Sequence, residues 1–384
     1  MNNNKKILII SPIPTHPPVS GNKARVLALA NTIRSEKYDV YFLHIEWRKG
    51  DEDSMREYWG DRYYKCAYTP PQTNFISKLF KHIYTKLGLQ AAFRYKLDEW
   101  YDETSNLCIQ KLQNKFHFDT VIVEYVFFSK ALDNFGPETT KILDTHDVFT
   151  DRHKHYLKQG KKPTWYSTSK RNESKGLNRA DIIIAIQNKE ATFFSTICSK
   201  TVVVVGHNID IKRVNSSEVI PNRVLFVASN NTINLQAANF LINKVLPKVK
   251  LKLPDIKLAF AGTISDSLSE IDGIEILGRV DDLASIYKTA VVVVNPVFIG
   301  TGLKIKTIEA LAHGKPLVTT SVGAEGLEEH TKESFLIGDT PDNFAEAVVK
   351  LLSNTEYAKQ LSEAGYNIID EYNKQNIEII NSIL

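Results

Sequence analysis

Short apolar runs alternate with stretches of helical periodicity through the first half of the chain. Residues 6–11 form a continuous apolar run that ends at prolines, and residues 40–44 form another. Between them, residues 22–35 repeat apolar side chains at helical spacing, including Val26, Leu29 and Ile33. This order is typical of parallel strands that are buried on both faces and joined by helices. Further β-rich apolar runs follow at 120–124, 141–143, 181–185 and 201–205.

A second series of strands begins after a polar break. Residues 1–206 are predicted to form one domain, and residues 207–222 turn polar and irregular, which is typical of an interdomain linker. Residues 223–355 are predicted to form a second α/β domain, and residues 356–384 to form terminal helices that can pack back on the first. The apolar runs of this second domain lie at 224–228, 257–262, 291–295, 316–319 and 334–337.

Length and charge narrow the class of protein. A chain of 384 residues exceeds what one hydrophobic core usually supports, which agrees with two domains. The formal charge of +4 is far smaller than that of a dedicated nucleic-acid binder, so no nucleic-acid partner is expected. No apolar run approaches the about 20 residues of a membrane helix, and prolines end the first run too early for a signal peptide. A cytoplasmic protein is expected, peripheral at the inner face of a membrane if it meets one.

The segment with the clearest chemistry is Gly300-Thr-Gly-Leu-Lys-Ile-Lys-Thr-Ile-Glu309. Two glycines follow a strand and precede a helix, where backbone N–H groups and the helix dipole favour an anion. Lys304 and Lys306 add cations in the first turn, where the dipole disfavours them, and this indicates an anionic partner. Glu309 lies further along the helix, where a carboxylate can accept two hydrogen bonds from a ribose diol. The alternative for all three side chains is an ordinary solvated helix surface.

This segment resembles the nucleotide-sugar motif of glycosyltransferase family 4, the glycosyl transferases group 1, which has the GT-B fold. The resemblance continues in Ser321-Val-Gly-Ala-Glu-Gly-Leu327 and in Ile276-Leu-Gly-Arg-Val280. In the first half it includes Gly21-Asn-Lys-Ala-Arg25 and the stretch from Leu143 to Arg152. It covers most of the chain and is weakest across residues 48–117.

The resemblance implies a fold of two facing, Rossmann-like, doubly wound α/β domains and a set of site residues. His146, Lys304 and Glu309 are the catalytic candidates: Glu309 would hold the ribose, Lys304 would face the diphosphate and sugar, and His146 would point toward the donor sugar. Gly21 would let its loop approach the phosphate. The expected donor-binding residues are Gly21, Gly300, Thr301, Gly302, Leu303, Lys306, Arg279 and Val280.

The resemblance also implies the reaction. Members of this kind transfer a sugar from a nucleotide-diphosphate sugar to a saccharide or lipid-linked acceptor, with retention of configuration and without a metal or a further cofactor. Bacterial surface polysaccharide biosynthesis is the expected setting. The alternatives are a GT-B-like sugar-nucleotide epimerase and a non-catalytic sugar-nucleotide-binding protein. A nicotinamide dehydrogenase is disfavoured because no Gly-x-Gly-x-x-Gly follows the first strand.

Two positions depart from the family pattern. Thr301 stands where many members have a glutamate, and Ser229-Asn-Asn-Thr-Ile-Asn234 replaces a segment that usually carries an arginine and a lysine. Phosphate contacts must then come from other residues. Lys304 and Lys306 are the nearest candidates, since a charge-assisted hydrogen bond contributes about 1.5–3 kcal/mol.

The surroundings of His146 admit other roles. Acidic residues and histidines crowd the segment after the strand at 141–143, but their spacing matches no regular metal site, so no metal is expected. The other alternative is that His146 does not contact the donor and only caps or packs its own loop. The crowded residues are Asp144, His146, Asp147, Asp151, His153 and His155.

Residues 74–95 form a separate feature, a basic stretch with helical amphipathicity. Apolar side chains recur at helical spacing beside Lys78, Lys81 and Lys86. An ordinary surface helix explains the pattern. A patch that meets anionic lipid headgroups is the alternative.

Overall fold

The computed structural model describes two compact units. One comprises Met1–Gly206 and Asn376–Leu384, and the other His207–Gln375. The residues that the structure describes are 4–18, 20–34, 38–71, 83, 90–158, 160, 162–163, 165–211, 218–280, 282–299 and 303–384.

The first unit is built on a seven-stranded sheet. Its strands are β1 Lys5–Ser11, β2 Tyr38–Ile45, β3 Tyr63–Cys66, β4 Thr120–Glu124, β5 Thr140–Asp144, β6 Ile182–Ala185 and β7 Thr201–Val204. They lie in the order β3-β2-β1-β4-β5-β6-β7, and every neighbouring pair is parallel. The order reverses between β1 and β4, and this is where doubly wound sheets bind ligands at the carboxyl ends of their strands.

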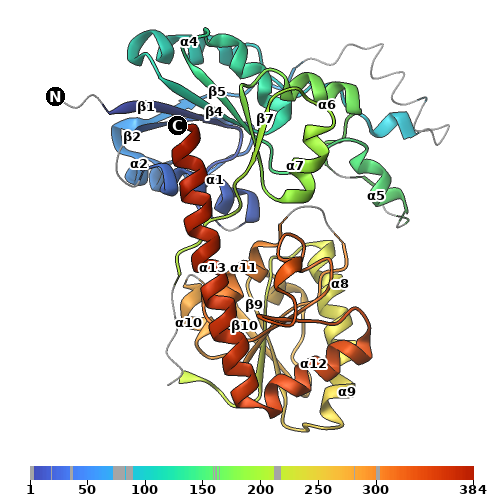
Figure 1. Cartoon of the computed structure of the whole chain (residues 1–384). Helices are drawn as coiled ribbons and strands as arrows, with labels where there is room; N and C mark the ends of the chain where they lie inside the picture. The colour runs from blue at the N-terminus through green and yellow to red at the C-terminus, as the bar shows by residue number, and fades with distance from the viewer. Residues whose placement is uncertain are drawn as a thin grey trace. The chain divides into compact units, whose positions relative to one another are not determined.

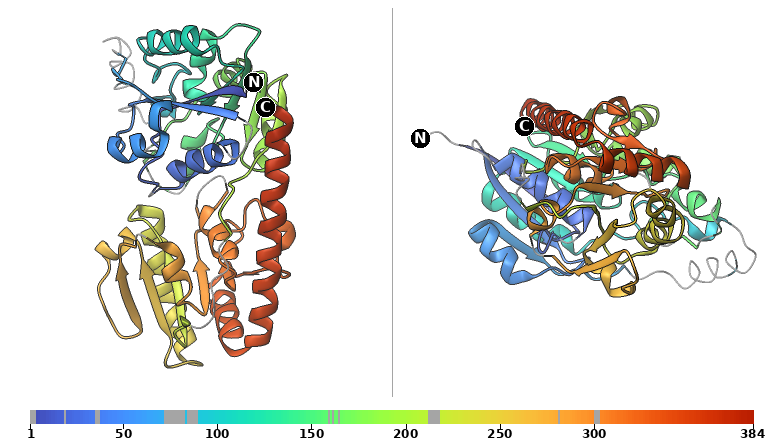
Figure 2. Two further views of the ribbon diagram at one scale, coloured as in Figure 1. Left: turned by 90° about the vertical axis from the view of Figure 1, so that its left-hand side faces the viewer. Right: turned by 90° about the horizontal axis from the view of Figure 1, so that it is seen from below.

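Helices cover both faces of this sheet. They are α1 Gly21–Arg34, α2 Glu52–Trp59, α4 Ser105–Phe116, α5 Arg152–Lys158, α6 Lys170–Leu177 and α7 Asn188–Ser195, with short 3₁₀ turns η1 Gly60–Arg62, η2 Gln90–Phe93 and η3 Val126–Asn134. Helices α1 and α4 lie on opposite faces (Figures 1 and 2). The strands are buried on both sides, as shown by Ile7 to Ile10, all of which are fully enclosed. Such strands appear as continuous apolar segments because no face meets water.

The second unit repeats the plan with six strands. They are β8 Arg223–Val227, β9 Lys257–Ala261, β10 Ile274–Gly278, β11 Val292–Asn295, β12 Leu317–Thr319 and β13 Leu336–Ile337. Their order is β10-β9-β8-β11-β12-β13, again parallel throughout.

The helices of the second unit cover its sheet in the same way. They are α8 Thr232–Phe240, η5 Leu241–Val245, α9 Leu246–Lys250, α10 Leu283–Tyr287, α11 Ile305–Ala312, α12 Pro341–Ser353 and α13 Thr355–Ile383, with 3₁₀ turns η6 Thr263–Ser267 and η7 Glu328–His330. One face of the sheet packs on α8, η5, α9 and α12 through apolar side chains that include Leu241, Val249 and Phe344.

The C-terminal segment is one long helix, α13, drawn in red in both views of Figure 2. The end of this helix from Asn376 onward, with the following Leu384, belongs to the first unit. There the side-chain oxygen of Asn376 accepts a hydrogen bond of 2.8 Å from the Gly206 N–H, and Lys5 Nζ donates to the Leu384 carbonyl at 2.6 Å. The last residues of the chain thus lie beside its first strand.

The fold class predicted from the sequence, two doubly wound α/β domains, is confirmed. Most strand positions agree to within two residues, and β3 and β10 are additions that the pattern of apolar runs did not reveal. Among the residues that the structure describes, no helix is long and apolar enough to cross a membrane. Most of the basic stretch at 74–95 lies outside the described residues.

Candidate active site

Two buried carboxylates and His146 meet at the carboxyl ends of β4 and β5 in the first unit. Glu124 ends β4, and His146 follows β5 by two residues. Glu124 Oε2 lies 2.5 Å from His146 Nε2, and Asp144 Oδ2 lies 3.8 Å from the same nitrogen. Glu124 is fully buried, and its Oε1 has no hydrogen-bond partner among the residues that the structure describes. This burial, with the nearby charge of Asp144, raises the pKa of Glu124 to about 7.

The backbone at these strand ends is strained. Tyr125 and His146 have positive φ values of 71° and 61°, a backbone conformation that residues other than glycine rarely adopt. Their rings stack with centroids 4.0 Å apart and an interplanar angle of 11°. Strained residues persist only where surrounding contacts hold them, and they gather at functional sites.

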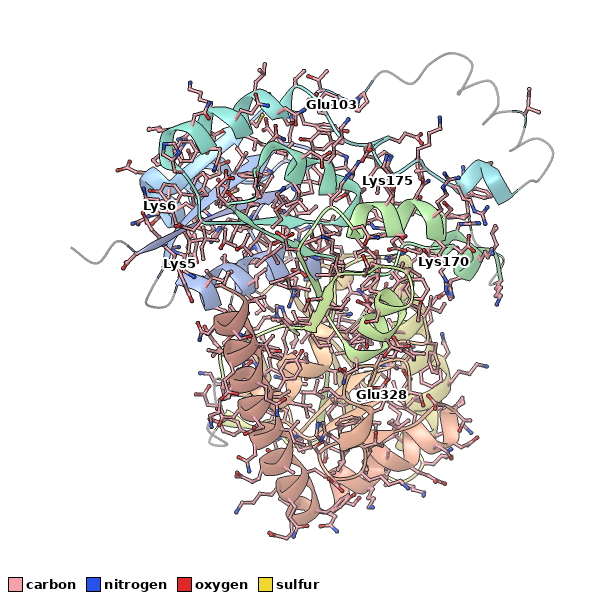
Figure 3. All side chains as sticks on the ribbon, turned by 45° about the horizontal axis from the view of Figure 1, so that its top comes forward. Lys5, Lys6, Glu103, Lys170, Lys175 and Glu328 are labelled. Carbon is pink, nitrogen blue, oxygen red and sulfur yellow. The ribbon has the colours of Figure 1, made fainter. Side chains whose placement is uncertain are left out.

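Two further groups hold the loop around His146. Arg25, on α1, donates from Nε and Nη2 to the two oxygens of Asp144 at 3.1 Å each, and it also contacts the Gly206 carbonyl. The side chains of Arg25 and Asp144 are 2% and 0% exposed. Glu173 accepts hydrogen bonds of 2.7 Å from the N–H groups of Phe149 and Thr150. Glu173 lies on α6, the helix on which Figure 3 labels Lys170 and Lys175.

The side-chain nitrogen and oxygen atoms of Glu124, Asp144 and His146 lie within 4.8 Å of one another, a spacing that a metal ion could bridge. Arg25, however, already engages both oxygens of Asp144, so an ion would have to compete with a buried guanidinium for that ligand. The other members of the crowded segment lie elsewhere. Asp147 pairs with Arg152 at 2.6 Å, Asp151 with Arg94 at 2.7 Å, His153 Nδ1 lies 2.8 Å from Ser167 Oγ, and His155 lies on α5.

The second unit places the lysine-bearing segment at the start of α11, in the position that the sequence predicts. Lys304 is the N-cap residue of this helix, and its Nζ lies 3.1 Å from Glu325 Oε2. Lys306 points to another neighbour: its Nζ donates to Asn234 Oδ1 at 2.6 Å and lies 5.2 Å from the centre of the Phe226 ring. The two lysines therefore contact different neighbours: Lys304 meets the turn that contains Glu325, and Lys306 meets the first turn of α8.

Lys306 and Glu309 form a partly enclosed pair of opposite charges. Both residues are half-buried, but their charged ends lie deep enough for desolvation to act on them. Desolvation lowers the pKa of Lys306 to about 8 and raises that of Glu309 to about 7, while each charge partly offsets the shift of the other. Perturbed groups of this kind at the edge of a parallel sheet are candidates for a binding site.

The remaining predicted site residues are scattered. Gly21 is the exposed first residue of α1, and Leu303 is buried just before α11. Arg279 is exposed and pairs with Asp266 at 2.9 Å, and Val280 is half-buried. Gly300, Thr301 and Gly302 lie outside the described residues.

Sequence reasoning missed several residues of these clusters. Glu124 ends an apolar strand and carries no local motif, and Arg25 stands in the sequence only as the last residue of the Gly21–Arg25 motif. Asn234 was regarded as a departure from the family pattern, yet it is the partner of Lys306. The available signal was the position of each residue at the carboxyl end of a predicted strand or at the start of a helix.

Comparison with known proteins finds a family match in the second half of the chain. Residues 221–354 match the family model of glycosyl transferases group 1. Across 98% of both chains, the sequence is 24% identical to an uncharacterized 44.6 kDa protein in the cps region of Klebsiella pneumoniae.

Solved structures share the fold at low sequence identity. Anabaena HepE in complex with UDP has a TM-score of 0.67 at 13% identity, covering 98% of this chain and 100% of HepE. Sucrose-phosphate synthase from Thermosynechococcus elongatus has a TM-score of 0.69 at 14% identity, with 99% and 98% covered. The pneumococcal O-GlcNAc transferase GtfA in complex with UDP and GlcNAc has a TM-score of 0.67 at 12% identity, with 99% and 98% covered. Residues 221–354 are thus a glycosyl transferases group 1 domain, in a chain with the two α/β domains of the GT-B fold.

Proposed function

We propose that the protein is a retaining glycosyltransferase that moves a sugar from a nucleotide-diphosphate sugar to a saccharide or lipid-linked acceptor. The observation that carries this proposal is the Lys306–Glu309 pair on α11, inside the segment that matches the group 1 family. Lys306 offers a cation to the diphosphate, and Glu309 offers a carboxylate to the ribose hydroxyls. Uridine is the proposed base, because HepE and GtfA were solved with UDP.

The transfer is proposed to need no metal ion. A departing nucleoside diphosphate carries negative charge that must be stabilised, and a cation or a helix N-terminus can do this in place of a metal. Lys304 and Lys306 at the start of α11 provide both features. Lys306 also reaches Asn234 in the first turn of α8, at the end of the segment where relatives usually have an arginine and a lysine. Its charge is proposed to replace theirs in part.

The proposed setting is surface polysaccharide biosynthesis. It is supported by the relative in the Klebsiella pneumoniae cps region, which aligns with almost the whole chain.

The proposed donor-site residues are Gly21, Gly300, Thr301, Gly302, Leu303, Lys306, Arg279 and Val280, with His146, Lys304 and Glu309 as the catalytic candidates.

A thermal-shift screen over the diphosphate sugars of uridine, guanosine, adenosine and thymidine tests the donor class. Ligand that binds only the folded state raises the melting temperature by mass action, by an amount equivalent to about 2.7 kcal/mol at a hundredfold excess over Kd. Incubation of the stabilising donor with saccharide acceptors, with and without EDTA, then tests for transfer and for metal independence. An epimerised donor without transfer would instead identify an epimerase, and binding without any reaction a non-catalytic relative.

Donor affinity is predicted to depend on pH in a bell-shaped manner. The diphosphate of UDP-glucose keeps its charge throughout the range, so the protein groups set the profile. Glu309 is ionised above its pKa of about 7, and Lys306 is charged below its pKa of about 8. Affinity should therefore fall below pH 7 and above pH 8, by up to about tenfold per pH unit on each side. Calorimetric titration of UDP-glucose from about pH 5.5 to about pH 9.5 measures both limbs.

Matched variants assign each limb to one residue. Glu309→Gln should remove the acidic limb and Lys306→Gln the alkaline limb, each with weaker affinity between the two pKa values. A profile that keeps both limbs in both variants would contradict the assignment.

We also propose a peripheral contact with anionic membranes through the basic stretch at 74–95. Each lysine near an anionic surface contributes about 1 kcal/mol, and salt screens this attraction. The protein is expected to float with phosphatidylglycerol vesicles at low salt, and a variant with Lys78, Lys81 and Lys86 changed to glutamate is expected to stay in the lower fraction. Wild-type protein that never floats would refute the contact.

A further inference from the structure

Three of the four tryptophans form one cluster in the first unit. The ring centroid of Trp47 lies 5.4 Å from that of Trp100 and 5.7 Å from that of Trp165, and Trp100 and Trp165 are 6.2 Å apart. All three residues are half-buried, so each keeps part of its surface exposed to solvent. We name this group, together with Arg48, the tryptophan platform.

The loops that present the platform are held by the fold. Trp47 and Arg48 follow β2, where the Arg48 N–H donates to the Pro12 carbonyl at 3.2 Å and His44 Nε2 lies 2.9 Å from the Arg48 carbonyl. Burial lowers the pKa of His44 to about 4, so its ring is neutral and can donate one N–H there at neutral pH.

The Trp100 and Trp165 loops are joined by Tyr166. Its hydroxyl donates to the Lys96 carbonyl at 3.1 Å, and its ring centroid lies 5.0 Å from that of Trp100. Each loop of the platform is therefore fixed by contacts within the first unit. The platform is preorganised rather than formed by mobile side chains.

Arg48 gives the platform a charge. Its guanidinium carbon lies 4.5 Å from the centre of the Trp47 ring and 5.8 Å from that of Trp165. The residue is exposed, and no carboxylate in the described part of the chain pairs with it. The N–H groups of the Arg48 guanidinium thus lie beside the Trp47 and Trp165 rings, where they can donate hydrogen bonds to a polar ligand.

A continuous series of rings joins the platform to His146. Tyr125 stacks on His146 at 4.0 Å, Phe127 stacks on Tyr125 at 4.9 Å, and Trp47 lies 6.0 Å from Phe127. Trp47 follows β2 and Phe127 follows β4, so the platform lies at the carboxyl edge of the sheet, as His146 does. This is the edge at which doubly wound sheets bind their ligands.

We propose that the tryptophan platform binds the saccharide part of the acceptor, an inference that rests on the proposed function. An indole has a negative face, and one side of a pyranose ring presents weakly positive C–H groups that pack against such a face. The hydroxyl or acidic oxygens at the rim of the sugar would accept hydrogen bonds from Arg48. A largely aromatic surface with a few donors is the usual composition of a small-molecule site. A lipid surface is less favoured, because Trp165 meets the other two indoles edge-on, at interplanar angles of 72° and 87°, so the three rings do not form one flat apolar face.

The test follows the indole N–H signals of the full chain by NMR while maltotriose, cellotriose and chitotriose are added separately. No nucleotide is present, so the result does not depend on the donor site. At least one trisaccharide is expected to shift the signals of Trp47, Trp100 and Trp165 in a saturable way. Trp59 is the internal control, because its indole is buried, stacks on Phe42 and donates to Thr15 at 3.1 Å.

Variants separate stacking from simple packing. Trp47→Phe keeps an aromatic face and should raise the Kd less than about threefold, whereas Trp47→Leu keeps an apolar side chain and should raise it by about tenfold or more. Arg48→Gln, at an exposed position, should weaken binding without affecting folding. The inference is overturned if no trisaccharide shifts the three tryptophan signals, or if the Trp59 signal shifts as much as they do. It is also overturned if the Trp47→Leu and Arg48→Gln variants bind the trisaccharide with wild-type affinity. A shift of the three signals by phosphatidylglycerol vesicles alone would equally overturn it. Trisaccharide binding without any nucleotide-sugar binding would instead keep the platform and refute the proposed transferase.

Discussion

Replacing Arg25 by alanine is expected to destabilise the first unit by about 3–5 kcal/mol. The guanidinium bonds both oxygens of Asp144, and both side chains are almost completely buried. Removal of Arg25 would leave the Asp144 carboxylate without its cation beside Glu124, a second buried acid. The loss should therefore exceed the value of the ion pair itself, because an unpaired charge stays in a medium that solvates it poorly.

Urea denaturation followed by tryptophan fluorescence measures the free energy of unfolding of the first unit. The signal comes from that unit because it contains all four tryptophans: Trp47, Trp59, Trp100 and Trp165. Arg62→Ala is the matched control. It breaks the ion pair of Arg62 with Asp39, whose side chains are 50% and 22% exposed, and should cost no more than about 1 kcal/mol. Equal losses in the two variants would show that the buried pair contributes no more than a surface one.

The fold was predictable because its signal is repeated. Strands buried on both faces appear as continuous apolar runs, and the six-strand and seven-strand sheets provide many of them. β3 was missed because Tyr63-Tyr-Lys-Cys66 is short, lies at the sheet edge and is buried only at its two end positions. Its strand identity depends on pairing with β2, a contact that no local pattern reports.

The sites were predictable where a motif carries them. Lys304, Lys306 and Glu309 lie at or near the start of one helix, so their spacing alone indicates a common site. Glu124 and His146 are 22 residues apart and meet only because β4 and β5 are neighbours in the sheet. The platform combines residues from three separate loops, and its tryptophans have no spacing in common. Contacts of this kind follow from sheet order and loop packing, which the sequence pattern does not specify in detail.

At the start of α11, two lysines that are close in sequence contact different parts of the second unit. Lys304 and Lys306 are two positions apart, and residues at that spacing point in different directions from a helix. Lys304 accordingly meets Glu325, whereas Lys306 meets Asn234. The family resemblance implies that Lys304 faces the diphosphate and sugar, and this stays a prediction because Gly300 and Gly302 lie outside the described residues.

His146→Ala is expected to reduce turnover by roughly tenfold to a thousandfold, equivalent to about 1.4–4 kcal/mol of transition-state stabilisation. His146 is the catalytic candidate proposed to act on the donor sugar in the reacting complex, whereas Lys306 and Glu309 are proposed to supply most of the donor affinity. Its loss should therefore lower kcat and leave UDP-glucose affinity, measured without acceptor, much less affected. Affinity that falls in proportion to turnover would make His146 a ground-state binding residue, and no change in either would make it an ordinary loop histidine.

Glu124→Gln tests how His146 is held. Glu124 Oε2 lies 2.5 Å from His146 Nε2 and so holds the orientation of the imidazole ring. Glu124 can act through His146 without contacting the substrate, and we therefore regard it as a positioning residue. Its pKa is raised to about 7, and only its ionised form, present above that pH, accepts the Nε2 proton with full charge. The measurement is kcat at saturating UDP-glucose, so that the pH dependence of donor affinity through Glu309 does not enter. Wild-type kcat should then fall as the pH drops below about 7, whereas the glutamine variant should be about tenfold slower at about pH 8 and nearly independent of pH between about 6 and 8. Tyr125→Phe, which keeps the stacked ring, is the control and should retain the wild-type profile. A glutamine variant that keeps the acidic limb would assign that limb to another group and leave Glu124 with packing alone.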